Sequence, residues 1–188
     1  MTALAPILSV RFFPRTANWL RDLALILAGS WLVALLAQIE IPLQPVPITG
    51  QTFAVLLVGA LLGSKRGAAA MVAYIAQGAM GLPFFAGGAS GFGILTGATA
   101  GYLVGFIGAA YAVGWLAERG LERSVRTSII PFLAGTLVIY ICGVAWLSFV
   151  LESFGLAVQY GLLPFLPGDG IKLVAAALAL PAAWKLVK

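Results

Sequence analysis

The sequence contains no histidine and a single cysteine among its 188 residues. Without histidine, the chain lacks the side chain used most often for general acid–base catalysis and for metal or haem ligation. One cysteine cannot form a disulfide within the chain, and Cys142 lies in an apolar run, which is typical of a small packing residue. We therefore expect no enzyme activity, no metal site and no bound cofactor.

Charged residues are also scarce: they make up 9% of the chain, whereas hydrophobic residues make up 62%. The mean hydropathy is +1.06. In a soluble domain, roughly a quarter of the residues are charged. This composition predicts a multi-pass protein of the cell membrane, embedded in the lipid bilayer. The net charge of +5 is explained by its distribution along the chain, so we expect no nucleic-acid partner.

Long uncharged stretches separate the charged residues. A helix that spans a bilayer needs about 20 residues, so the uncharged stretch 67–117 is too long for one helix. Glycine and proline interrupt that stretch at 81–93, which divides it into two. We predict an all-α membrane protein, with residues 1–188 forming a single integral membrane substrate-binding domain of six transmembrane helices, at about 21–40, 48–63, 67–82, 93–117, 128–151 and 168–186.

The basic residues predict the orientation of these helices. In the six-helix arrangement, ten of the 11 Lys and Arg residues lie on one side of the membrane. The positive-inside rule makes that side cytoplasmic, with both termini there and outer loops at about 40–47, 83–92 and 152–167. A cleaved signal peptide is the alternative for the N-terminus, but the first apolar run is not followed by an Ala-x-Ala site.

Lys172 is the basic residue that breaks this pattern, because it lies toward the outer side. Pro167-Gly168-Asp169 predicts a helix start, which puts Lys172 about one turn inside the membrane. An unpaired cation at that depth is costly, so either Asp169 or an anionic ligand must compensate it. A pair with Asp169 alone leaves unexplained why a cation stands at a helix start, where an anion is favoured. The pattern therefore favours a binding site for a charged solute.

The segment between the first two helices is rich in proline, with prolines at 42, 45 and 47. Only about 13 residues of helix follow before Ser64, or near 20 Å, which is short of a hydrocarbon core of about 30 Å. We therefore expect the segment to dip into the membrane toward the ligand, where Thr49, Gln51 and Thr52 offer hydrogen bonds. The alternative is a simple connector with a helix cap at Thr49.

Small residues spaced one helical turn apart mark two candidate packing faces. Glycines stand at 93, 97, 101 and 105, and they favour close approach of another helix. The same stripe could instead form a cavity wall, with Tyr102 on a neighbouring face. Ala24 and Ala28 mark a weaker candidate surface for a partner helix on the first span.

Two further motifs bear on ligands. Phe84 and Phe85 stand beside glycines in an outer loop, where they either lie at the membrane interface or cover an apolar ring of a ligand. The segment 59–65 superficially resembles a phosphate-binding loop, but it has the wrong spacing between its glycines and the wrong order at its end. The chain therefore has no ATP site of its own.

Four segments, taken together and in this order, resemble the BioY family: Val46–Thr52, Gly81–Gly88, Gly97–Leu103 and Pro164–Lys172. Members of this family are the biotin-specific S components of energy-coupling factor (ECF) transporters. The resemblance covers about residues 20–186 and implies a six-helix protein that binds biotin from outside. It also implies two kinds of partner, a transmembrane coupling (T) subunit and two cytoplasmic ATPases.

The resemblance also implies roles for individual residues. Asp169 and Lys172 match the ligand-binding Asp and Lys of the family's last motif. Ala24 and Ala28 look like the small-residue motif that faces the coupling subunit. The chain departs from the family at Gly50, Ala98, Ala100 and Gly170, where other residues are usual. These departures concern the fine shape of the pocket rather than the class of protein.

Biotin has a carboxylate, a ureido ring and an apolar thioether ring. Lys172 suits the carboxylate, Asp169 and Gln51 could accept from the ureido N–H groups, and Thr49 could bond the ureido carbonyl. The thioether ring could pack on three aromatic side chains: Phe84, Phe85 and Tyr102. The pairing of each polar group with an end of biotin stays open.

Two alternatives also stay open. One is an S component for a different small anionic vitamin, which a panel of radiolabelled vitamins would distinguish. The other is a solitary or oligomeric vitamin transporter, which uptake without any partner ATPase would favour.

Replacing Lys172 by alanine should lower biotin affinity far more than Lys185→Ala, because only Lys172 belongs to the expected site. Equilibrium binding of labelled biotin to the two purified variants measures the difference. Small and equal effects would contradict the assignment of Lys172.

Overall fold

The computed structural model describes residues 19–121 and 124–175, and helices dominate this part of the chain. The α-helices are α2 (Trp19–Ala37), α3 (Gln51–Leu62), α4 (Ser64–Ala79), α5 (Ala100–Ala117), α6 (Val125–Val150) and α7 (Phe154–Gly161). Residues 166–175 are helical as well. The short elements are the strands β1 (Glu40–Ile41) and β2 (Ile48–Thr49) and the 3-10 helices η1 (Ala86–Gly88) and η2 (Phe92–Thr96).

Three of the described helices are long and apolar enough to cross a membrane: Trp19–Ala37, Ala100–Ala117 and Thr127–Val150. α3 has 12 residues and α4 has 16, so both are shorter than a full span of about 20 residues. The prediction of an all-α membrane protein is therefore confirmed, with a small hairpin added.

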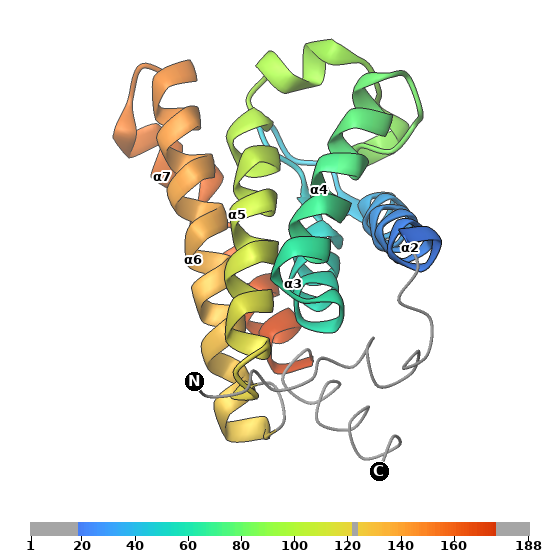
Figure 1. Ribbon diagram of the computed structural model, residues 1–188. Coiled ribbons are helices and arrows are strands. Elements are labelled where there is room, and N and C mark those ends of the chain that lie inside the picture. The colour runs from blue at the N-terminus through green and yellow to red at the C-terminus, as the bar shows by residue number, and fades with distance from the viewer. Residues whose placement is uncertain (1–18, 122–123, 176–188) are drawn as a thin grey trace.

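α5 is the central helix of the bundle, because it packs against α3, α4 and α6 (Figure 1). α2 lies on α4 at one edge and is seen nearly end-on, while α7 lies beside the upper end of α6 (Figure 1). The buried core runs between these helices and contains mostly aliphatic and aromatic side chains, including Tyr74, Phe132 and Met71.

Glycines allow the central helices to touch backbone to backbone. A methyl group added at Gly59 of α3 would lie 2.7 Å from the carbonyl oxygen of Ala110 in α5. One added at Gly114 of α5 would overlap the backbone of Ser64, at the start of α4. Small residues at helix crossings permit such close approach, which brings side chains from different helices within reach of one another.

The predicted glycine stripe is only half of a packing face. Gly101 and Gly105 lie on α5 and face Cys142 and Ile139 of α6, so packing is their role. Gly93 lies in η2 and Gly97 directly after it, and a methyl group added at either would meet no atom outside that turn. The helix begins at Ala100 rather than at residue 93, because η2 precedes it.

Ion pairs and a cap join the helices at the end of the bundle that carries the basic residues. Asp22 of α2 pairs with Arg66 of α4 at 3.0 Å. Glu118, which follows α5, accepts hydrogen bonds from both the backbone nitrogen and the hydroxyl of Ser64, each at 2.8 Å. A carboxylate at the start of α4 also suits the positive end of that helix.

The Pro-rich segment forms a hairpin, in which Glu40 pairs with Thr49 and Ile41 with Ile48. The alternative of a helix cap at Thr49 is met in part: the residue before α3 is Gly50, but the Thr49 hydroxyl accepts from the backbone N–H of Gln51, the first residue of α3, at 3.3 Å. The predicted start of the second helix at residue 48 is therefore three residues too early, since the strand β2 occupies that position.

The chain after α6 also differs from the predicted loop at 152–167, because it contains the helix α7. The last described helix is already formed at residue 166, and the Asp169 N–H donates to the carbonyl of Phe165 at 2.8 Å. Asp169 therefore lies inside the helix, rather than at the helix start that Pro167-Gly168-Asp169 predicted. Lys172 lies roughly 9 Å along the helix from residue 166, deeper than one turn.

The junction of α6 and α7 combines two helix caps. Glu152 has a positive φ of 51°, and Ser153 N–H donates to the carbonyl of Ser148 at 3.2 Å, as in a Schellman motif. The Ser153 hydroxyl then accepts from Leu156 N–H at 3.3 Å and caps α7. The turn therefore depends on a backbone conformation at Glu152 that residues other than glycine rarely adopt.

Glu152→Gly should raise the free energy of unfolding by about 0.5–1 kcal/mol, because glycine adopts a positive φ without steric cost. Thermal unfolding in detergent would measure this, with Glu152→Ala as the matched control that removes the charge and keeps the strain. Equal unfolding temperatures for the two variants would contradict the explanation.

Candidate ligand-binding site

Lys172 lies at the centre of a partly buried polar network. Its ammonium donates to Asp169 Oδ1 at 2.8 Å, to the backbone carbonyl of Thr49 at 2.7 Å and to Thr52 Oγ1 at 2.9 Å. An ammonium group has three protons, so all of them are used. The network therefore joins the helix 166–175 to the hairpin and to α3.

Asp169 is equally well satisfied. Its Oδ1 atom also accepts from Thr52 Oγ1 at 3.3 Å, and its Oδ2 atom accepts from the Tyr140 hydroxyl at 2.6 Å. The residue is only 8% exposed. A buried charge is tolerated when an opposite charge and hydrogen bonds surround it, which is the arrangement here.

This network borders a cavity between the hairpin, α3, α5, α6 and the last described helix. Water-sized spheres can occupy only about 50 Å³ of it, although the empty space between its walls, mouth included, is about 570 Å³. The polar residues that line it are Thr49, Gln51, Thr52, Thr99, Tyr140 and Lys172. The aromatic residues that line it are Phe85, Tyr102, Phe106 and Phe165. A narrow, mostly apolar cavity with a few convergent polar groups is typical of a small-molecule site.

Gln51 is held in the cavity wall by Tyr74. The Gln51 amide nitrogen donates to the Tyr74 hydroxyl at 2.8 Å, and that hydroxyl donates to the Phe84 carbonyl at 3.2 Å. Gln51 Oε1 has no hydrogen-bond donor among the residues that the structure describes. Its carbonyl oxygen is therefore the free acceptor in this part of the site.

Phe85 and Tyr102 both line the cavity, as the sequence led us to expect. Phe85 is 2% exposed, and its ring lies directly against Gly78 of α4. The Tyr102 hydroxyl donates to the Gly161 carbonyl at 2.7 Å, and the ring stacks on Phe165 with 6.4 Å between centroids. Tyr102 is therefore fixed at both its ring and its hydroxyl.

Phe84 lies elsewhere. Its ring stacks on Tyr74, with 6.4 Å between centroids, and meets Trp31 edge-on at 6.0 Å. It lines a shallow groove with Trp31 and Gln38 rather than the cavity. Two adjacent phenylalanines thus face different environments, because the backbone is extended at Phe85 and successive side chains of an extended chain point to opposite sides.

Ala24 and Ala28 lie on the exposed face of α2, together with Leu20, Leu23 and Leu27. Nothing in the described part of the chain covers this face. Its role as a partner surface stays a prediction.

Tyr140 and Phe165 line the cavity but were not predicted from the sequence. Tyr140 is the one tyrosine in the long apolar helix α6, and a polar group at that depth was the available signal. Phe165 lies in a segment that we expected to be an outer loop, so nothing in its position indicated burial.

The geometry can be compared with known proteins. A family model described as the BioY family matches residues 7–188. The chain belongs to the BioY family. The resemblance carried by the four sequence segments is therefore confirmed.

Two relatives illustrate the extent of the match. The biotin transporter BioY of Thermotoga maritima is 43% identical over 155 residues, which make up 82% of this chain and 86% of that protein. The biotin transporter BioY of Rhizobium etli is 38% identical over 168 residues, or 84% of this chain and 90% of that protein. These BioY relatives are described as transporters, in line with the expectation of a non-enzymatic membrane protein.

A solved structure has the same fold. It is described as the crystal structure at 2.1 Å of the S-component for biotin from an ECF-type ABC transporter. The TM-score is 0.80 at 26% sequence identity, and the match covers 90% of this chain and 94% of that one. This member of the BioY family therefore has the S-component fold.

Lys172→Met should lower the free energy of unfolding by about 3 kcal/mol or more, because it leaves the Asp169 carboxylate buried without its counter-ion. The double variant Asp169→Asn with Lys172→Met should be more stable than Lys172→Met alone, since it removes that orphaned charge. Unfolding of the ligand-free protein in detergent measures the free energy of unfolding of the single and the double variant. A double variant less stable than the single one would contradict the pairing.

Proposed function

We propose that this chain is the biotin-binding S component of an ECF transporter in the cell membrane. The observation that carries the proposal is the cavity beside the Lys172–Asp169 network, in a chain of the BioY family. The biotin transporter of Thermotoga maritima and the solved S-component for biotin supply the name of the ligand.

The chemistry of the cavity suits biotin. Lys172 lines the cavity and can exchange one of its three protein acceptors for a carboxylate oxygen of the ligand. The free Oε1 atom of Gln51 can accept from a ureido N–H group, and Phe85 and Tyr102 offer apolar surface for the thioether ring. Asp169 has both oxygens occupied, so it serves mainly as the counter-ion of Lys172.

Binding requires the cavity to widen. The space open to water-sized spheres is about 50 Å³, which is little for a bicyclic ligand with a side chain. The hairpin is held to the last described helix through Lys172 and Thr49. A ligand oxygen that replaces the Thr49 carbonyl would release the hairpin and enlarge the site, with the ammonium still satisfied.

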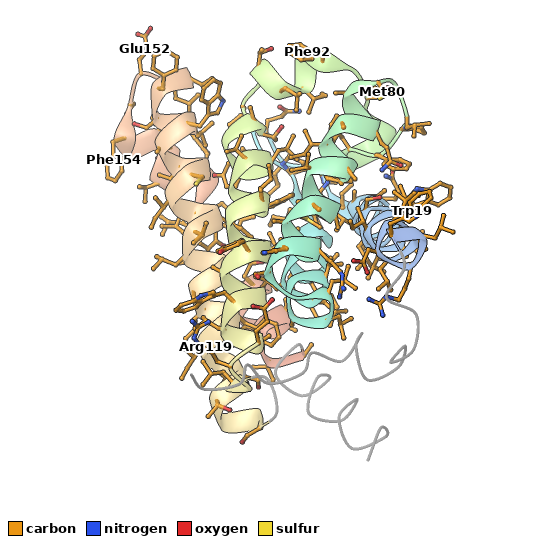
Figure 2. All side chains as sticks on the ribbon, viewed as in Figure 1. Trp19, Met80, Phe92, Arg119, Glu152 and Phe154 are labelled. Carbon is orange, nitrogen blue, oxygen red and sulfur yellow. The ribbon has the colours of Figure 1, made fainter. Side chains whose placement is uncertain are left out.

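The proposal includes six membrane spans with both termini in the cytoplasm. α2, α3, α4, α5, α6 and the helix that contains 166–175 are the candidates for these spans. Arg119 lies at the lower end of the bundle, whereas Met80, Phe92 and Glu152 lie at the upper end (Figure 2). This separation supports a basic cytoplasmic face and an outer face formed by η2 and the α6–α7 junction.

The energy for transport would come from other chains. The sequence has no phosphate-binding loop, so a T subunit and two cytoplasmic ATPases are the proposed partners. Ala24 and Ala28, on the exposed face of α2, form the proposed contact with the T subunit.

A titration of the purified chain with biotin should give saturable binding at one site. Thiamine, riboflavin and folate should not compete. Lys65→Ala, which changes an exposed lysine far from the cavity, should bind as the native chain does, whereas Lys172→Ala should lose roughly a hundredfold in affinity. Preference for another vitamin would overturn the proposal.

Biotin methyl ester tests the orientation of the ligand in the same assay. It should bind the native chain more weakly than biotin, and the difference should nearly vanish in Lys172→Ala, because the ester lacks the charge that Lys172 would bind. An ester that binds the native chain as tightly as biotin would place Lys172 at the ureido end instead.

A further inference from the structure

We propose that Tyr140 is a positioning residue of the ligand site, which holds the Asp169 carboxylate and, through it, the Lys172 ammonium. The inference rests on the proposed function, because its ligand is biotin. Tyr140 contacts Asp169, and Asp169 in turn acts on the ligand through its ion pair with Lys172.

The contact itself is a strong one. The Tyr140 hydroxyl donates to Asp169 Oδ2 at 2.6 Å. Hydrogen bonds from a hydroxyl to a carboxylate have lengths of about 2.5–2.7 Å when the acceptor is ionised, and they are roughly twice as strong as bonds between neutral groups. The Asp169 side chain is only 10% exposed, so water competes little for this bond.

The two carboxylate oxygens have different partners. Oδ1 faces Lys172 and Thr52, whereas Oδ2 faces Tyr140. Without the hydroxyl, no other donor in the described residues holds Oδ2, and the carboxylate is free to rotate about its Cβ–Cγ bond. The ammonium would then follow whichever oxygen it pairs with, and its position toward the cavity would vary.

The contact also links separate helices. Tyr140 comes from α6, Thr52 from α3, and Lys172 from the last described helix. In the described part of the chain, Tyr140 provides the hydrogen bond from α6 to the ion pair. Three helices thus meet at one carboxylate, and α6 determines which way that carboxylate faces.

Tyr102 offers a matched comparison. It also lines the cavity and also donates one hydrogen bond from a largely buried phenol, but its acceptor is the Gly161 backbone carbonyl. Removing either hydroxyl costs one hydrogen bond and keeps the ring. Only removal of the Tyr140 hydroxyl should change the position of the Lys172–Asp169 pair, because the Tyr102 hydroxyl does not contact it.

The first experiment compares biotin affinity in the full chain. Tyr140→Phe should weaken binding roughly tenfold or more, whereas Tyr102→Phe should weaken it much less. Tyr111→Phe, which changes an exposed tyrosine of α5, serves as the unaffected control. Affinity measured well below the unfolding temperature is the readout that a purely structural role would not move. Equal affinities for Tyr140→Phe and the native chain would overturn the inference.

The second experiment needs no ligand. Unfolding temperatures are measured for Tyr140→Phe, Asp169→Ala and the double variant, and for the same cycle with Tyr102→Phe. The effects of Tyr140→Phe and Asp169→Ala should not add, because the second removes the acceptor of the first, whereas those of Tyr102→Phe and Asp169→Ala should add. Additive effects in the Tyr140 cycle would overturn the inference.

The two proposals fail differently. A native chain that does not bind biotin contradicts the proposed function, and the ligand-free cycle then decides whether Tyr140 acts on Asp169. A native chain that binds biotin and tolerates Tyr140→Phe contradicts the inference alone.

Discussion

The buried ion pair between Lys172 and Asp169 is the interaction on which the ligand site depends. A charge inside a membrane protein is stable only when partners replace the water that it has lost. Here the partners come from the hairpin, α3 and α6, so the pair draws these elements together. The same contacts that stabilise the charges also define one side of the cavity.

The network can form because the helices approach closely. Gly59 and Gly114 let α3 and α4 touch the backbone of α5, and Gly101 and Gly105 do the same between α5 and α6. Short side chains such as Thr52 can then reach across to another helix. The packing of the bundle and the chemistry of the site are therefore two consequences of the same small residues.

The sequence predicted the polar half of the site better than the aromatic half. Lys172 was recognisable because a cation on the outer side breaks the charge pattern, and Asp169 because it stands three residues away. Phe84 and Phe85 are indistinguishable in the sequence, yet only Phe85 lines the cavity. The start of the last helix was placed too late, because Pro167-Gly168 looked like a boundary although proline fits the first turn of a helix.

The sequence by itself determined the membrane class, the family and the residues most directly concerned with charge, because hydropathy and charge are properties of the chain read in order. Only the tertiary structure decided which residues meet. Tyr140 contacts Asp169 across 29 residues, and Lys172 contacts Thr49 across 123. Such contacts depend on the angle and depth at which helices pack, and no local pattern in the chain encodes those quantities on its own.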